Sequence, residues 1–293
     1  MSLRFNTKSQ MSLQSRSDSS AAPEICGDGR MSLGNRLRYM ALNFVRNLDF
    51  RKPAVSPTRF CMPRQSRTSG LVSPSRSLTE AFLCRKLPAM LPVGEIRVLD
   101  IGCGAGGLVR LLAELGYRGS YVGIDIQDGF DRSEQPGFEK SFLAIDAHQY
   151  RPEDKFDLVI SVSALEHIPD DARLIRRLGE FLLPGGLQLH FVPSEWALPV
   201  YLWHGYRQYT ATSLAERFGT SQAAVFSLGG APSFFLHLLF ITVWEILFRL
   251  NLRKRLSGLY TRMLDACLEF DRSLPALGTF YAVVWRAEPP LPV

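Results

Sequence analysis

The chain has 293 residues, of which 46% are hydrophobic and 21% are charged, which is ordinary for a globular protein and excludes a wholly disordered chain. Its formal net charge of +6 is unevenly placed, because residues 1–70 hold 12 Lys and Arg against 4 Asp and Glu, whereas the remaining residues hold 22 against 24. The basic character therefore belongs to the N-terminal part of the chain.

Cysteine usage argues against a disulfide framework and against a zinc site. The five cysteines are odd in number, and no two of them have the short spacing of a metal-binding knuckle. The first 30 residues also lack the apolar stretch of a secretory signal peptide. We therefore expect no bound metal and a cytoplasmic location.

Residues 1–76 are expected to form a basic, largely disordered extension with one short helix. Polar residues dominate up to residue 35, without periodicity. Apolar residues then recur at helical spacing over residues 36–48, with arginines between them. Two placements of this amphipathic helix are open. It covers the edge of its own domain, which is the more common arrangement, or it lies on a membrane surface. Residues 51–76 have the composition of a linker.

Residues 77–293 are expected to form the folded domain. Ser77 and Glu80 have capping-box spacing, so a helix is predicted over residues 78–87, ended by Pro88. Strands are then predicted at residues 98–101, 121–125, 142–145, 158–162 and 187–192, with helices at 109–115 and 171–183. This alternation predicts an α/β fold with a doubly wound, mostly parallel sheet.

The C-terminal part is expected to hold a helical insertion, residues 231–275, before a last strand at 279–285. Shorter elements are predicted at residues 213–218 (helix), 223–227 (strand) and 259–270 (helix). Residues 234–248 are strongly apolar but too few for a membrane span, which needs about 20 apolar residues. Two interpretations are open: a buried helix or lid over the substrate pocket, or an interfacial helix whose basic end, residues 249–255, lies among anionic headgroups.

The most informative segment is residues 98–107, Val-Leu-Asp-Ile-Gly-Cys-Gly-Ala-Gly-Gly, in which a strand runs through a glycine-rich turn into a helix. Glycine tolerates positive φ and lets the backbone approach a ligand closely. The N-terminus of the helix offers free N–H groups, which suit a carboxylate or a pyrophosphate. Gly102, Gly104 and Gly107 also satisfy the dinucleotide spacing, so the turn alone does not choose between ligands.

Three carboxylates at successive strand ends narrow the choice. Asp100 is placed to accept a hydrogen bond from an amino group. Asp125 ends the next strand, where a carboxylate can hold both hydroxyls of a ribose. Asp146 follows the third strand, where it can accept from the exocyclic amine of an adenine. Because ligands of open α/β sheets bind outside the carboxyl ends of the strands, we expect the three to face one crevice.

With these motifs the chain resembles the class I S-adenosylmethionine-dependent methyltransferases, and within them the small-molecule branch that includes the ubiquinone and menaquinone biosynthesis methyltransferases. The resemblance covers about residues 78–230 and the last strand. It rests on the matched segments 98–107, 121–126, 145–147, 156–167 and 182–186. It implies a Rossmann-like sheet of seven strands whose last strand is antiparallel, a feature that a nicotinamide dehydrogenase would lack.

The resemblance also implies where S-adenosylmethionine binds. The glycine turn would hold the methionine moiety, Asp125 the ribose, and Ile126 with Asp146 the adenine, while residues 161–167 would lie under the reactive methyl group. The implied cofactor-binding residues are Asp100, Gly102, Cys103, Gly104, Gly106, Asp125, Ile126, Asp146, Ala147, Ser161 and Ser163. Cys103 lies where a small residue is tolerated and is not interpreted as a nucleophile.

Methyl transfer needs orientation above all, and an oxygen or nitrogen nucleophile also needs a base. His167, at the end of the Leu-Glu-His stretch, and His204, after the fifth strand, are the candidate catalytic residues. A structural role stays open for both; His204 and Arg207 could instead fix their loop.

The sequence thus predicts methyl transfer from S-adenosylmethionine to an oxygen or nitrogen of a small or lipid-linked acceptor, of the quinone, glycolipid or polysaccharide precursor type. The alternatives are an NAD-dependent oxidoreductase and a cofactor-binding but inactive membrane or partner module. No nucleic-acid partner is expected, because no aromatic-and-basic RNA-binding module is visible. Under the interfacial interpretation, residues 36–48 and 234–255 contact a membrane surface.

Overall fold

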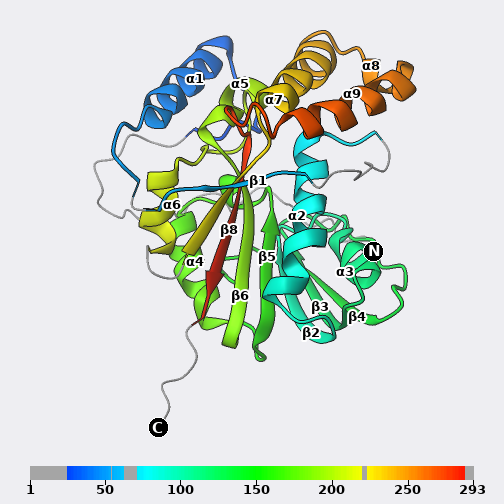
Figure 1. Cartoon of the computed structure of the whole chain (residues 1–293). Coiled ribbons are helices and arrows are strands. Elements are labelled where there is room, and N and C mark those ends of the chain that lie inside the picture. The colour runs from blue at the N-terminus through cyan, green and yellow to red at the C-terminus, as the bar shows by residue number, and fades with distance from the viewer. Residues whose placement is uncertain (1–24, 54, 63–70, 220–222, 288–293) are drawn as a thin grey trace, which may run out of the picture.

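The computed structural model describes residues 25–53, 55–62, 71–219 and 223–287, which build one sheet with helices on both faces (Figure 1). In spatial order the strands are β1 (Thr58–Phe60), β7 (Ala223–Leu228), β8 (Phe280–Arg286), β6 (Leu182–Pro193), β5 (Phe156–Val162), β2 (Glu95–Ile101), β3 (Arg118–Asp125) and β4 (Phe138–Ala144). Strand β8 is antiparallel to both of its neighbours, and the other pairs are parallel. The predicted mostly parallel sheet with a reversed last strand is confirmed.

Strand β1 is an addition to the seven strands that were predicted. It lies within the segment interpreted as a linker and pairs in parallel with β7, Phe60 opposite Leu228. The ring of Phe60 is buried and meets Phe82 edge-on, with 5.0 Å between ring centroids. Three residues are too few to show an alternating pattern, so no sequence signal pointed to this strand.

Helices cover both faces of the sheet, and the strands feed a separate core on each face. The helical elements after β1 are α2 (Pro74–Met90), α3 (Leu108–Glu114), η1 (Leu165–His167), α4 (Asp171–Glu180), η2 (Glu195–Ala197), α5 (Leu198–Tyr201), α6 (Ala211–Phe218), α7 (Ala231–His237), the π-helical η3 (Leu238–Leu247), α8 (Leu252–Arg255) and α9 (Ser257–Phe270). Val98 packs with α2, α3 and α9, whereas Leu99 packs with α4 and α6. Successive residues of a strand point to opposite faces, so this apolar run serves both cores and makes the sheet doubly wound.

Several boundaries of helices and strands differ from those expected. Helix α2 begins after Ser73, whose side chain accepts a backbone N–H of the first turn, so Ser77 lies inside the helix and does not cap it. Pro88 does not end α2, because it lies in the last turn, where its missing N–H costs one hydrogen bond only. Residues 182–183, predicted to end a helix, begin strand β6.

The structure describes part of the N-terminal extension. Helix α1 (Leu33–Asn47) is the predicted amphipathic helix, and Tyr39 on it is fully buried against the domain. The Tyr39 hydroxyl donates to the backbone oxygen of His204 at 2.7 Å. Residues 1–24 lie outside the described residues, so the prediction of disorder there stays a prediction.

Helix α1 turns its apolar side outward. It buries Tyr39 and Asn43, whereas Leu37, Phe44 and Val45 are 64%, 58% and 67% exposed. The helix therefore lies on its own domain, which was the favoured placement, but its apolar side does not make the contact. The helix contacts the domain through its more polar side and leaves its apolar side uncovered by the described chain.

The apolar insertion is helical, as predicted, but it is neither fully buried nor fully exposed. Phe234 and Phe240 are buried, whereas Phe235 and Phe248 are more than half exposed. Glu245, the single acidic residue of the apolar stretch 234–248, receives two hydrogen bonds of 2.6 Å from the guanidinium of Arg253. Among the described residues, no helix has both the length and the hydropathy that a membrane crossing requires.

Candidate functional site

The glycine turn between β2 and α3 presents bare backbone at the carboxyl end of the sheet. Gly102, Gly104 and Gly106 have φ values of 67°, 54° and 83°, which other residues rarely adopt. A Cβ on Gly102 would lie 2.4 Å from the Cβ of Ala164, and one on Gly106 would lie 2.5 Å from the ring of Phe142. Nothing lies within 4 Å of the position that a Cβ on Gly104 would occupy, so that residue faces open space.

Asp100 lies beneath this turn and is 3% exposed. The hydroxyl of Tyr121 donates to its Oδ2 at 2.5 Å. Burial raises the pKa of Asp100 to about 7; the hydrogen bond from Tyr121 opposes this rise and the nearby charge of Asp125 adds to it. A carboxyl group so poorly solvated gains strongly from a cationic partner, which fits the amino group of a methionine moiety.

Burial likewise raises the pKa of the Cys103 thiol, and the charges of Asp100 and Asp125 add to this rise. The thiol therefore stays protonated near neutral pH, and a protonated thiol is a poor nucleophile. This agrees with the interpretation that Cys103 is a small residue of the turn.

Asp125 ends β3 directly beside the turn. Its carboxylate accepts the backbone N–H of Gly104 at 3.0 Å and of Gln127 at 3.1 Å, which fixes its orientation. The next side chain, Ile126, is 75% exposed. An uncovered aliphatic group next to a fixed carboxylate suits an adenosine, which presents an apolar ring and two ribose hydroxyls.

Asp146 and Ala147 follow β4, the neighbour of β3. Asp146 is exposed, and its Oδ1 accepts the backbone N–H of His148 at 2.7 Å. Asp100, Asp125 and Asp146 thus belong to three adjacent strands of one parallel array, as the sequence predicted.

Of the two serines assigned to the cofactor, the structure corrects one. Ser161 is fully buried within the sheet, and its hydroxyl pairs at 2.8 Å with Nδ1 of His190 on β6, so its side chain cannot reach the crevice. Ser163 lies two residues later, directly after β5, and has a positive φ of 53°. Its hydroxyl donates a hydrogen bond to Oε1 of Glu166 at 2.5 Å. It shapes the loop that follows β5.

The two candidate catalytic histidines lie together. The rings of His167 and His204 are nearly perpendicular, with 4.5 Å between centroids. Oε1 of the fully buried Glu166 lies 3.9 Å from Nε2 of His167 and 3.5 Å from Nε2 of His204. On the other side, Asp28 accepts from Nδ1 of His167 at 2.7 Å and lies 3.7 Å from Nδ1 of His204.

This arrangement changes the protonation of both partners. Burial opposes a charge on His167, but the hydrogen bond to Asp28 and the charge of Glu166 outweigh it, and the pKa of His167 is raised. Burial opposes ionisation of Asp28 as well, but the hydrogen bonds from His167 and from the Gly205 N–H lower its pKa. Nδ1 of His167 is therefore the donor and Asp28 the ionised acceptor.

Asp28, His167 and His204 are also the set of side chains, among those described, whose ligand-type atoms converge within 4.8 Å of one another. This cluster could not be predicted from the sequence, because its three residues are far apart along the chain. In this structure the contacts between them are hydrogen bonds and charge pairs.

The other candidates near this loop have structural roles. Arg207 pairs with Asp171 at 3.0 Å, and both side chains are buried. Its guanidinium also donates to the backbone oxygen of Ile168, so Arg207 fixes the loop, as one of the open interpretations held. His190 and His237 are buried, and burial lowers the pKa of each to about 3.

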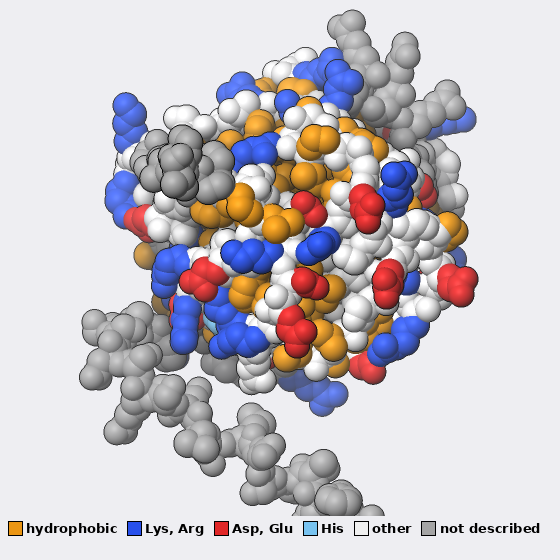
Figure 2. All heavy atoms as spheres, turned by 90° about the horizontal axis from the view of Figure 1, so that it is seen from below, with side chains coloured by type: hydrophobic (Ala, Val, Ile, Leu, Met, Phe, Trp, Pro, Cys, Tyr) orange, Lys and Arg blue, Asp and Glu red, His pale blue; other side chains and the backbone are white. Residues whose placement is uncertain are grey.

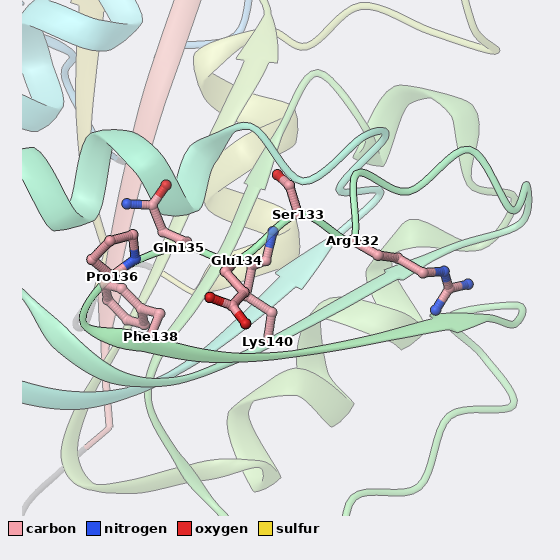
Figure 3. A pocket seen from close by; sticks show the side chains of 7 residues that line it. All are labelled: Arg132, Ser133, Glu134, Gln135, Pro136, Phe138 and Lys140. Atoms are coloured by element: carbon pink, nitrogen blue, oxygen red, sulfur yellow. The ribbon is translucent and has the colours of Figure 1, made fainter.

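Two of the cavities between described residues lie away from the assigned cofactor positions. The first, about 310 Å³, is formed by the loop before β4 and the start of that strand, where Figure 3 shows the guanidinium of Arg132 directed away from Glu134 and Lys140. The second, about 220 Å³, lies between the end of α1 and the start of α6. Among its arginines, Arg51 is paired with Asp49. Neither cavity includes an assigned cofactor position.

Sequence comparison shows the family to which the chain belongs. A family model described as a methyltransferase domain matches residues 76–224, about half of the chain. A ubiquinone biosynthesis O-methyltransferase from Bradyrhizobium diazoefficiens is 33% identical over 110 residues, which are 36% of this chain and 43% of that protein. One from Ruegeria pomeroyi is 34% identical over 111 residues, again 36% of this chain and 44% of that protein. The chain thus matches less than half the length of these curated relatives.

Among solved structures, a putative sarcosine dimethylglycine methyltransferase from Galdieria sulphuraria is similar, with a TM-score of 0.48 and 16% identity over 72% of this chain and 86% of that one. The chain belongs to the methyltransferase domain family. S-adenosylmethionine is the cofactor of this class, and the open backbone at Gly104, the buried Asp100 and the pair Asp125 and Ile126 fit its amino acid and adenosine parts.

Sequence reasoning missed Asp28, which lies in a stretch that was interpreted as disordered. It also gave Glu166 no role beyond membership of the Leu-Glu-His motif. No local pattern could have revealed Asp28, because 139 residues separate it from His167.

Proposed function

We propose that this protein transfers a methyl group from S-adenosylmethionine to an oxygen or nitrogen of a small or lipid-linked acceptor. The observation that carries the proposal is the position of Asp100, Asp125 and Asp146 at the carboxyl ends of three adjacent strands, beside the open turn at Gly104. An NAD-dependent oxidoreductase is disfavoured, because the reversed strand β8 and the family match belong to methyltransferases.

When bound, S-adenosylmethionine supplies a methyl group on a positively charged sulfur. The residues of the chain align the acceptor with that methyl group, and orientation of this kind is worth about 7–11 kcal/mol. Ala164, which packs on Gly102 of the turn, begins the segment that leads to His167. His167, which ends this segment, and His204, whose ring lies against it, are the residues proposed to accept the proton that the acceptor loses.

The exposed apolar helices support a lipid-linked acceptor. In Figure 1 the arrow of β8 points to one end of the sheet. Helix α1 and the group α7, α8 and α9 lie at the opposite end. This is the carboxyl end of the parallel strands, where the residues assigned to the cofactor lie. Helix α5 contacts both α1 and η3 and joins the two groups. Exposed cations accompany the apolar side chains: Arg36 and Arg38 on α1, and Arg249, Lys254 and Arg255 after η3.

The opposite end of the molecule has a different surface. Figure 2 shows acidic and basic side chains intermingled with small groups of hydrophobic ones there. Apolar helices rimmed by cations suit the interface of an anionic bilayer, which would bring the crevice to an acceptor held in the membrane.

The activity is tested with the full chain, S-adenosylmethionine labelled on its methyl group, and separate lipid and water-soluble extracts as acceptor sources. We expect label in the lipid fraction, and we expect Asp125→Ala to lower its incorporation at limiting cofactor at least tenfold. The control Asp154→Ala changes an exposed carboxylate on the loop before β5 and should leave incorporation unchanged.

Label confined to water-soluble products would contradict the lipid-linked acceptor but not the methyl transfer. Absence of label from every fraction, with a protein that still binds S-adenosylhomocysteine, would favour the inactive module.

A further inference from the structure

The chain just before α1 lies directly on the loop that follows α5. The N–H of Gly27 donates to the backbone oxygen of Gly205 at 2.6 Å, and the N–H of Gly205 donates to Oδ1 of Asp28 at 3.1 Å. A Cβ on Gly27 would lie 2.5 Å from the backbone nitrogen of His204 and 2.6 Å from the carbonyl carbon of Trp203. Backbone cannot yield as a flexible side chain does, so only glycine fits at residue 27.

Side chains of α1 hold the same loop. Tyr39 donates to the backbone oxygen of His204, and the guanidinium of Arg36 lies over the ring of Trp203 at 4.4 Å from its centroid. The stretch from Gly27 to Tyr39 is thus fastened to the loop at several points, which explains how Asp28 is kept at a fixed position although its side chain is 39% exposed.

We propose that Asp28 is a positioning residue for His167, and that the chain before α1 is therefore part of the active site. Asp28 holds the Nδ1–H of His167 at 2.7 Å, which fixes the ring and its tautomer and leaves Nε2 as the nitrogen that accepts a proton. The carboxylate of Glu166, which lies near Nε2, has its Oε2 buried without a hydrogen-bond partner, so it favours a proton arriving on that nitrogen.

The charged and titratable groups that face His167 come from four elements. They are Asp28 before α1, Glu166 beside it in η1, His204 in the loop after α5, and Asp125 at the end of β3. Within the described part of the chain, Asp28 is the residue that makes a hydrogen bond with the ring, so it is the contact to remove. The catalytic meaning of the inference rests on the proposed methyl transfer, whereas the contact can be tested without it.

The test is an NMR titration of the full chain labelled in its five histidines, with the signals assigned by single His→Gln substitutions. In Asp28→Asn, which keeps the shape but removes the charge, the titration midpoint of His167 should move to lower pH. Gly27→Ala should produce the same shift, because its Cβ must push the segment off the loop. The matched control is Gly29→Ala, because a Cβ there meets nothing within 4 Å.

A positioning role predicts that Asp28→Asn and Gly27→Ala each bind S-adenosylhomocysteine with an affinity within about twofold of the wild type. The kcat of methyl transfer should fall about 10-fold to 100-fold, which does not exceed the contribution of a general base to the rate. An unchanged midpoint in Asp28→Asn would overturn the inference, and so would equal shifts in Gly27→Ala and Gly29→Ala. Loss of S-adenosylhomocysteine binding would also contradict it, because the segment would then support the cofactor turn. A midpoint that moves on addition of a chelator would assign the effect to a bound cation.

Discussion

Two aspartates of the candidate cofactor site differ in burial and in hydrogen bonding. Asp100 is nearly inaccessible to water, and its hydrogen bond from Tyr121 does not compensate for the burial. Asp125 accepts hydrogen bonds from two backbone N–H groups, which fix the orientation of its carboxylate toward a ligand. The two aspartates therefore differ in their contacts. The buried carboxyl of Asp100 accepts from the hydroxyl of Tyr121, whereas the carboxylate of Asp125 is held by two backbone N–H groups.

We expect the affinity for S-adenosylhomocysteine to rise with pH through the pKa of Asp100, about 7, which burial raises from its usual acidic range. The ammonium group of the ligand binds the ionised carboxylate, so below this pKa the protein must first lose a proton, and affinity should fall by up to about tenfold per pH unit. Calorimetric titrations between about pH 5.5 and 7.5, where the ligand amine stays charged, measure this slope.

In Asp100→Asn the slope should disappear and the affinity should be low throughout. A wild-type affinity that is flat with pH would show that Asp100 does not carry the amino group.

At the scale of elements, α1 and the insertion are unusual because they leave apolar side chains outside. Phe44 on α1 and Phe248 after η3 are 58% and 61% exposed. The combined change Phe44→Ser and Phe248→Ser should reduce co-sedimentation with anionic vesicles by about tenfold. The reason is that partial burial of two phenylalanine rings in the membrane interface is worth about 1–2 kcal/mol of binding free energy. Val93→Ser, at an exposed apolar residue of the opposite end, is the matched control.

High salt should weaken this co-sedimentation, because the surrounding cations contribute through charge. Equal sedimentation of the double variant and the wild type would contradict the membrane proposal.

The same elements show what sequence could predict. The seven long strands and the glycine turn follow from alternating apolar segments and from glycines, which act locally. The orientation of α1 could not be predicted from its amphipathic pattern, because that pattern fixes which residues share a side and not which side faces the domain. The placement of Ser161 was also beyond reach, since its partner His190 comes from a different strand.

For the whole molecule, the fold gathers its functional parts at one end. The sheet presents the glycine turn and the carboxylates there, and the N-terminal stretch returns to the same end to hold the histidines. The apolar helices lie at this end as well (Figure 1). Asp28 and His167 are 139 positions apart, which is why the glycine turn and the carboxylates could be predicted from sequence motifs but the role of the N-terminal stretch could not.

The assignment of S-adenosylmethionine as the cofactor is tested by a calorimetric titration of the full chain with S-adenosylhomocysteine, with NAD(H) in parallel. We predict micromolar binding of S-adenosylhomocysteine, weakened at least tenfold by Asp125→Ala and unchanged by Asp154→Ala, and no binding of NAD(H). If the folded protein does not bind S-adenosylhomocysteine, or binds NAD(H) in its place, S-adenosylmethionine is not the cofactor bound beside the glycine turn.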